Sequence, residues 1–206
     1  MTISLSDAGK RFNYDWIFRH FTYTFQSGNR YAIVGPNGSG KSTLLQAIAG
    51  AAWLSEGALI ATDSTGRPIP DDQLFKQVAL AAPYLDVIEE MTLIEFFSFQ
   101  EKFHPFQPGI GPALICQRLE LEKASHKQIR YFSSGMKQRV KLGQALFTAK
   151  PIVLLDEPCT NLDAAGIALY HGLLEELSEN KLLVICSNDE QEIRTTTDRI
   201  DIRDYK

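Results

Sequence analysis

The amino-acid sequence predicts an α/β fold in which a mostly parallel sheet is flanked by helices, and three features of the 206 residues indicate it. A glycine-rich segment at 35–42, GPNGSGKS, separates a short apolar, β-branched run at 30–34 from a helical apolar pattern at 43–49. Two further apolar runs, at 152–155 and 181–186, are typical of buried strands and end in polar residues. Ligands of open α/β sheets bind where the strands end, so these polar residues are candidates for a site.

The glycine-rich segment matches the phosphate-binding pattern G-x-x-x-x-G-K-[ST] at each specified position. Its glycines let successive N–H groups point into one concavity, and the start of the following helix adds positive potential there. We expect Lys41 to reach the outer phosphates of a nucleotide and Ser42 to bind a Mg²⁺ ion that the nucleotide carries. A structural glycine-rich turn is the alternative, and the flanking strand and helix count against it. The expected nucleotide-binding residues here are Gly35, Pro36, Asn37, Gly38, Ser39, Gly40, Lys41, Ser42 and Thr43.

Two adjacent acids, Asp156 and Glu157, follow the apolar run at 152–155. Because side chains alternate along a strand, we expect the two carboxylates to face different directions and to do different work. Asp156 suits the magnesium shell, and Glu157 suits the polarisation of an attacking water. Together with the phosphate loop, these acids predict nucleotide hydrolysis on a P-loop NTPase core.

Composition and charge exclude several other classes. The net charge is −4 and the basic residues are scattered, so nucleic acid is not expected as a ligand. Cys116, Cys159 and Cys186 lack the CxxC spacing of zinc sites, which favours reduced thiols in a cytosolic protein. No apolar run approaches the ~20 residues that span a bilayer, and no signal peptide is evident, so a role at a membrane would need a separate chain for the spans.

The chain is expected to form a single domain, 1–206, in two parts. The catalytic core comprises 1–84 and 149–206, and 85–148 form an inserted helical subdomain, with helices expected at 92–103 and 113–122. The N-terminal part is expected to be antiparallel, with short β runs at 3–5 and 21–25 on either side of a polar, aromatic segment. Further predictions are a strand at 56–60, an Asp-, Gly- and Pro-rich loop at 63–72, a strand at 78–82, a helix at 136–148 and a final strand at 198–203.

The sequences GPNGSGKS, FSSGMKQR, IVLLDEP and NLD occur in this order, and the combination resembles the ATP-binding cassette (ABC) ATPases over nearly the whole chain. The resemblance implies a cofactor pair of ATP and Mg²⁺ and an ATPase that dimerises head to tail with a second cassette, identical or different. It also implies a separate membrane-spanning permease, driven from the cytoplasmic face. The SSGMKQR-like signature is similar to that of ATPase subunits of small bacterial exporters.

The resemblance also implies functional roles for residues to which the motif spacing alone gives none. It implies that the segment Ser133, Ser134 and Gly135 contacts the γ-phosphate of ATP held by the partner subunit. It implies that Asp163 lies in the loop that crosses the dimer interface and that Phe12 stacks on adenine. Taken alone, a serine at a helix start is usually an N-cap, and an aromatic residue usually packs on the sheet.

Two positions depart from the family pattern. Pro83-Tyr84 stand where the family has a glutamine, and Asn188 stands where it has a histidine after the last catalytic strand. Asn188 is therefore expected to face the γ-phosphate beside Glu157. Two functions stay open at this point: a transport ATPase subunit, which Glu157 favours, and a regulatory or non-transport ATP-binding module with low turnover, which the two departures favour.

Overall fold

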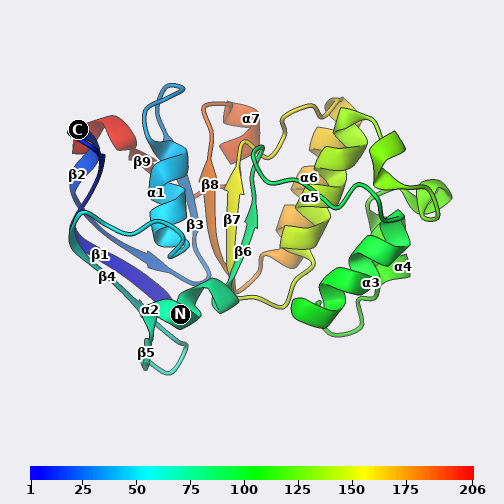
Figure 1. Ribbon diagram of the computed structural model, residues 1–206, viewed down its shortest axis with the longest axis horizontal. Helices are drawn as coiled ribbons and strands as arrows, with labels where there is room; N and C mark the ends of the chain where they lie inside the picture. Colours follow the sequence, from blue (N-terminus) through cyan, green and yellow to red (C-terminus); the bar gives the residue numbers. More distant parts are fainter.

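The computed structural model describes residues 1–206 and confirms the predicted α/β class (Figure 1). Two sheets share the molecule, one antiparallel and one parallel, and helices lie between them and beyond the parallel sheet. Short 3₁₀ turns lie at Phe75–Gln77, Glu122–Ala124, Ile129–Tyr131 and Ile202–Tyr205. The other elements, in chain order, are β1 Thr2–Phe12, β2 Asp15–Gln26, β3 Arg30–Val34, α1 Lys41–Ile48, β4 Glu56–Thr62, β5 Pro68–Ile69, α2 Asp71–Leu74, β6 Val78–Ala81, α3 Leu93–Phe103, α4 Pro112–Arg118, α5 Ser134–Leu146, β7 Ile152–Asp156, α6 Ala164–Leu177, β8 Leu182–Cys186, α7 Glu190–Ile193 and β9 Asp198–Asp201.

The parallel sheet has the strand order β6-β7-β8-β3-β9, and every neighbouring pair in it is parallel. Cys186, at the end of β8, pairs with Asp156 of β7 on one side and with Ile33 of β3 on the other. The carboxyl ends of three strands that are distant in sequence are thereby brought to one edge. The loops that follow these strands must meet there, which is where ligands of open α/β sheets bind.

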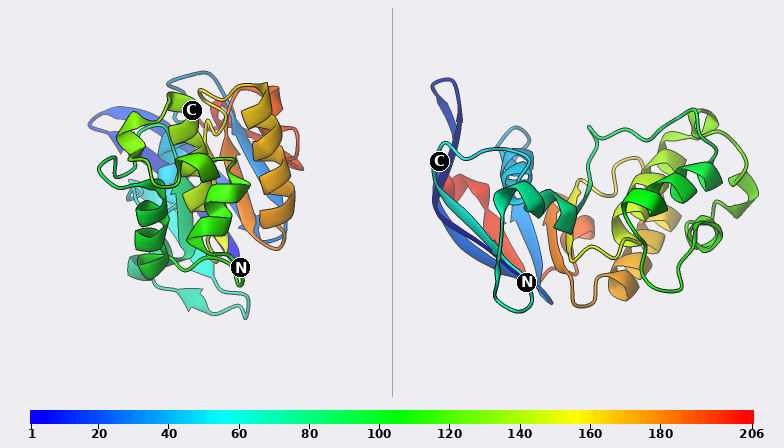
Figure 2. Two further views of the ribbon diagram at one scale, coloured as in Figure 1. Left: turned by 90° about the vertical axis from the view of Figure 1, so that its right-hand side faces the viewer. Right: turned by 60° about the horizontal axis from the view of Figure 1, so that its bottom comes forward.

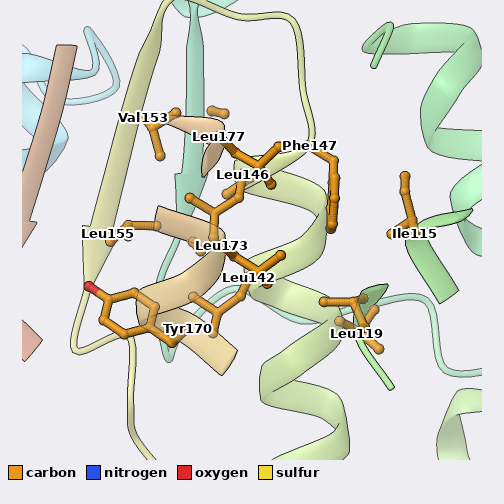
Figure 3. Packing of buried hydrophobic residues seen from close by; sticks show 14 of the residues in the cluster. Ile115, Leu119, Leu142, Leu146, Phe147, Val153, Leu155, Tyr170, Leu173 and Leu177 are labelled. Atoms are coloured by element: carbon orange, nitrogen blue, oxygen red, sulfur yellow. The ribbon is translucent and has the colours of Figure 1, made fainter. Parts of the chain in front are cut away.

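Side-chain alternation along the central strands divides the interior into two cores. Val153 and Leu155 of β7 belong to the core that faces α3–α6, whereas Ile152 and Leu154 belong to the core that faces α1 and the antiparallel sheet. Figure 3 shows the first core, where β7 packs against α5 and α6 and where Ile115 and Leu119 extend the packing to α4. Both faces of the parallel sheet are therefore covered, as its continuous apolar strands require.

The N-terminal strands are longer than the sequence predicts. β1 and β2 form one hairpin with the turn at Asn13-Tyr14, and the segment expected to separate two short runs is itself mostly strand. Three register shifts along β1 interrupt the alternation of apolar and polar residues on which the prediction relied. This hairpin belongs to the antiparallel sheet, of order β2-β1-β4-β5, which lies on the far side of α1 from the parallel sheet (Figure 1).

The helices of 85–148 lie on one side of the parallel sheet, as both views of Figure 2 show. α3 begins where Thr92 and Glu95 form a capping box, and α5 begins at Ser134, two residues earlier than predicted, with Ser133 as its N-cap. Two helices, α6 and α7, were not predicted, nor were β5 within the expected loop at 63–72 and the short α2 that begins at the end of that loop. None of the helices combines the length and the apolar character that crossing a membrane needs.

Candidate functional site

The glycine-rich loop lies between β3 and α1, at the upper edge of the parallel sheet in Figure 1. Its path requires glycine at Gly40, where φ is +103° and a Cβ atom would fall 2.5 Å from Ile17 Cγ2 on β2. Lys41 folds back into the loop, because its Nζ donates hydrogen bonds to Gly35 O at 2.6 Å and to Pro36 O at 3.3 Å. Lys41 is thus buried, at 5% exposure, and the loop carbonyls hold its ammonium group at the place where the sequence predicts phosphate.

Asp156, the last residue of β7, lies on the same side of the strand as Ile152 and Leu154, which is the side of α1. The Ser42 side chain, in the first turn of α1, lies beside its carboxylate. Burial raises the pKa of Asp156, and the nearby Ser42 hydroxyl opposes that rise. A hydroxyl and a carboxylate are hard oxygen donors of the kind that Mg²⁺ prefers, and two protein ligands leave the other positions for phosphate and water. The residues present therefore fit the expected ion.

The prediction was that strand alternation sets the direction of the Glu157 side chain, and the structure differs on this point. Glu157 lies outside β7 and adopts a left-handed conformation with φ +45°, so strand alternation does not govern where its side chain points. Its backbone N–H donates to Cys186 O at 2.9 Å, which continues the pairing of β7 with β8 by one residue. Glu157 borders a hollow of about 260 Å³ that Asn188, Asp189 and Glu192 also line.

Asn188 connects the end of β8 to the glycine-rich loop. Its Oδ1 accepts a hydrogen bond from the Gly35 N–H at 3.0 Å, and its Nδ2 donates to Asn37 Oδ1 at 3.4 Å. The structure thus brings the phosphate loop, Ser42, the acid pair and Asn188 together at one edge of the parallel sheet.

Tyr84, which stands in place of the family's glutamine, follows β6 at the same edge. The Gln46 side chain of α1 lies beside its hydroxyl, and partial burial raises the pKa of that hydroxyl. The preceding Pro83 carbonyl accepts a hydrogen bond from Lys141 Nζ at 3.0 Å, which links this loop to α5.

The second group of predicted residues lies elsewhere. Ser133, Ser134 and Gly135 line a hollow of about 830 Å³ together with Asp163, and no residue of the phosphate loop lines it. Ser133 Oγ accepts from the Met136 N–H at 3.3 Å, and Asp163 caps α6 by accepting from the Gly166 N–H at 2.8 Å. Gly135 is in close contact with the neighbouring loop, since a Cβ atom there would lie 2.9 Å from Asn161 O.

Phe12 ends β1 and is 52% exposed. Its hairpin contacts the phosphate loop through Ile17 and Gly40, and the ammonium group of Lys10 lies 5.0 Å from the centre of the Phe12 ring. An accessible aromatic ring therefore stands on the element that borders the phosphate loop.

Sequence reasoning missed Glu192. This acid of α7 is buried, and its Oε1 accepts a hydrogen bond from the Cys159 N–H at 2.7 Å. The available signal was weak: Asp189, directly after the predicted switch position, caps a helical turn that ends in Glu192 and Ile193.

The comparisons with known proteins identify the family. The pattern of the family described as "ABC transporter" matches residues 18–160. The chain is 29% identical to an uncharacterized ABC transporter ATP-binding protein, YybJ, of Bacillus subtilis, over 95% of this chain and 89% of that protein. It is 31% identical to the cytochrome c biogenesis ATP-binding export protein CcmA of Brucella abortus, over 87% and 81% of the two chains. It also spans about half the length, 56%, of the maltose/maltodextrin import protein MalK of Yersinia pestis, at 31% identity over 98% of this chain.

The fold is likewise that of known cassettes. A dimeric structure of the bacterial ABC transporter cassette MJ0796 superimposes with a TM-score of 0.81, at 23% identity, over 97% of this chain and 94% of that one. Family pattern, relatives and fold agree: the chain belongs to the ABC transporter family, as an ATP-binding subunit that hydrolyses ATP. The class resemblance inferred from the motifs is confirmed.

Replacing Lys41 with Ala is expected to weaken Mg-ATP binding and to leave the fold intact. The ammonium group would supply charge-assisted hydrogen bonds of ~1.5–3 kcal/mol, so we expect the Kd to rise by about 10- to 100-fold. Isothermal titration calorimetry measures the change, and Lys102→Ala on the exposed face of α3 is the matched control. An unchanged Kd in Lys41→Ala would show that Lys41 does not bind the phosphates.

Proposed function

We propose that this cassette binds Mg-ATP at the edge formed by the phosphate loop, Ser42, Asp156, Glu157 and Asn188. The convergence of these groups carries the proposal, because a phosphate cradle, two oxygen ligands for Mg²⁺ and a carboxylate beside an open hollow are the parts that hydrolysis needs. On binding ATP, Lys41 exchanges the loop carbonyls for phosphate oxygens. Ser42 and Asp156 would hold Mg²⁺, which would neutralise part of the charge on the phosphates.

Glu157 polarises the attacking water in this proposal. Its carboxylate borders the hollow next to Asn188, whose amide contacts Gly35 and Asn37 of the phosphate loop. Asn188 then donates a hydrogen bond to the γ-phosphate, and Phe12 offers its exposed ring to the adenine base. The amide is neutral, so it stabilises developing negative charge less than a charged donor would.

We propose further that two cassettes close on ATP, with Ser133, Ser134 and Gly135 of one protomer completing the γ-phosphate shell of the other. The hollow at Ser133 is open, begins at the N-terminus of a thirteen-residue helix and is lined by no residue of a phosphate loop. The dimeric state named for the MJ0796 cassette supports this arrangement. Asp163 and Asn161, on the wall of the same hollow, would lie at the interface.

The cassette is proposed to drive a separate membrane-spanning partner from the cytoplasmic face. Three exposed aromatic residues, Trp53, Phe75 and Phe103, form a surface that we call the Phe75 surface. Trp53 and Phe75 line one hollow, Phe75 and Phe103 line the next, and the surface joins the end of α1 to the end of α3. Exposed apolar surface of this kind marks protein-interaction sites, and here it contacts both the core and the helical insertion.

The dimer proposal predicts opposite effects for two substitutions. Glu157→Gln should bind Mg-ATP without hydrolysing it and should accumulate a dimer, and adding Ser133→Arg should abolish that dimer because the longer cation fills the phosphate-facing hollow. Sedimentation velocity with Mg-ATP measures both, and Ser64→Arg on an exposed turn is the matched control. A double variant that dimerises as well as Glu157→Gln alone would exclude Ser133 from the interface.

The role of Asn188 predicts that Asn188→His accelerates turnover. An imidazolium donor gives a charge-assisted bond about 1 kcal/mol stronger than an amide, so kcat should rise roughly fivefold with little change in the KM for ATP. Steady-state ATPase assays test this, and Glu157→Gln should abolish turnover in both backgrounds. Equal kcat values for wild type and Asn188→His would show that position 188 does not face the γ-phosphate.

A further inference from the structure

A buried carboxylate bridges two loops that the proposed mechanism treats separately. Glu192 is 4% exposed, and its Oε1 accepts from the Cys159 N–H at 2.7 Å. The Ser187 side chain also lies beside this carboxylate, whereas Oε2 is buried without a partner at normal hydrogen-bond distance. Burial raises the pKa of Glu192, and the negative charges of Asp189 and Glu157 add to that rise. Burying a partly unsatisfied acid is costly, which calls for a reason other than packing.

The first loop that Glu192 holds leads from the acid pair to the proposed dimer surface. Cys159 lies two residues after Glu157, and the same loop continues to Asn161, which contacts Gly135, and to Asp163, which caps α6. A displacement of Asn161 and Asp163 would therefore reach the Cys159 N–H through four residues of backbone. The hydrogen bond from the Cys159 N–H to Glu192 would transmit that displacement from the loop to α7.

The second loop belongs to the protomer's own ATP site. α7 begins after Asn188 and Asp189, and the Asp189 N–H donates to Ser187 Oγ at 2.9 Å. Asn188 itself accepts from the Gly35 N–H. The Glu192 backbone is fixed as well, because the Tyr170 hydroxyl of α6 donates to Glu192 O at 3.1 Å. A short rigid segment thus connects the phosphate loop with the loop behind Glu157.

We infer that Glu192 is a positioning residue that couples the two ATP sites of the proposed dimer. It ties the loop at 159–163, which faces the partner, to the loop at 187–189, which holds Asn188 against the phosphate loop. Closure of the partner's site moves the first loop, and the Glu192 carboxylate transmits that movement to Asn188. This inference rests on the proposed dimer function and assigns a residue that the proposed function leaves unused.

Two substitutions at Glu192 separate coupling from folding. Glu192→Leu removes the acceptor for the Cys159 N–H, whereas Glu192→Gln keeps an amide oxygen in its place. For a two-site dimer, the Hill coefficient for ATP in steady-state hydrolysis lies between about 1 and 2. We expect it to fall to about 1 in Glu192→Leu, with kcat at least about fivefold lower and Mg-ATP affinity of the monomer within about twofold of wild type. Glu192→Gln should restore cooperativity.

Controls make every outcome decisive. Glu190→Gln, on the exposed face of the same helix, loses an ion pair with Arg199 and should leave cooperativity unchanged. If Glu192→Leu does not fold, Tyr170→Phe removes only the hydroxyl that fixes α7 and should lower the Hill coefficient in the same direction. Suppose that the wild type is cooperative and that Glu192→Leu has the same Hill coefficient. That result overturns the inference and leaves the proposed dimer standing. If Glu192→Leu does not fold, an unchanged Hill coefficient in Tyr170→Phe has the same meaning. A wild type that dimerises with ATP but hydrolyses it with a Hill coefficient of about 1 overturns the coupling alone. A wild type that does not dimerise with ATP overturns the proposed dimer and, with it, the coupling.

Discussion

The parallel pairing of β3, β8 and β7 is the constraint on which the candidate site depends. Cys186 pairs with Ile33 on one side and with Asp156 on the other, so the phosphate loop, the acid pair and Asn188 must leave the sheet as neighbours. The hydrogen bonds from Gly35 to Asn188 and from Glu157 to Cys186 are local consequences of that pairing. Two apolar cores hold the sheet from both faces, and the cost of disturbing either core keeps the strand register fixed.

Sequence reasoning located the elements that carry strong local signals. The phosphate loop, the buried strands β7 and β8, and α3 follow from short-range patterns of glycine and apolar residues. The same reasoning failed where tertiary contacts decide the backbone. The β1–β2 hairpin contains register shifts that break alternation, and Glu157 takes a left-handed conformation that no strand pattern encodes. Glu192 was missed because its partner, the Cys159 N–H, lies 33 residues away in sequence.

The two departures from the family pattern acquire physical meaning from their surroundings. Asn188 contacts the phosphate loop. Having asparagine in place of the family's histidine therefore changes the charge available beside the loop but not where the side chain lies. Tyr84 keeps a hydroxyl beside Gln46 at the same edge, and Lys141 ties its loop to α5, the helix that begins at the signature serines. Both positions thus keep polar groups at the proposed ATP-binding edge, which agrees with a hydrolysing subunit.

The central claim is that each ATP is enclosed by two protomers. A crystal structure of Glu157→Gln with Mg-ATP measures this directly, through the distance from Ser133 Oγ of one protomer to the γ-phosphate bound at Lys41 of the other. The account predicts a hydrogen-bond distance of about 3 Å at both sites of a two-fold dimer. A γ-phosphate contacted only by residues of its own chain, with the Ser133 hollow open to solvent, would contradict it.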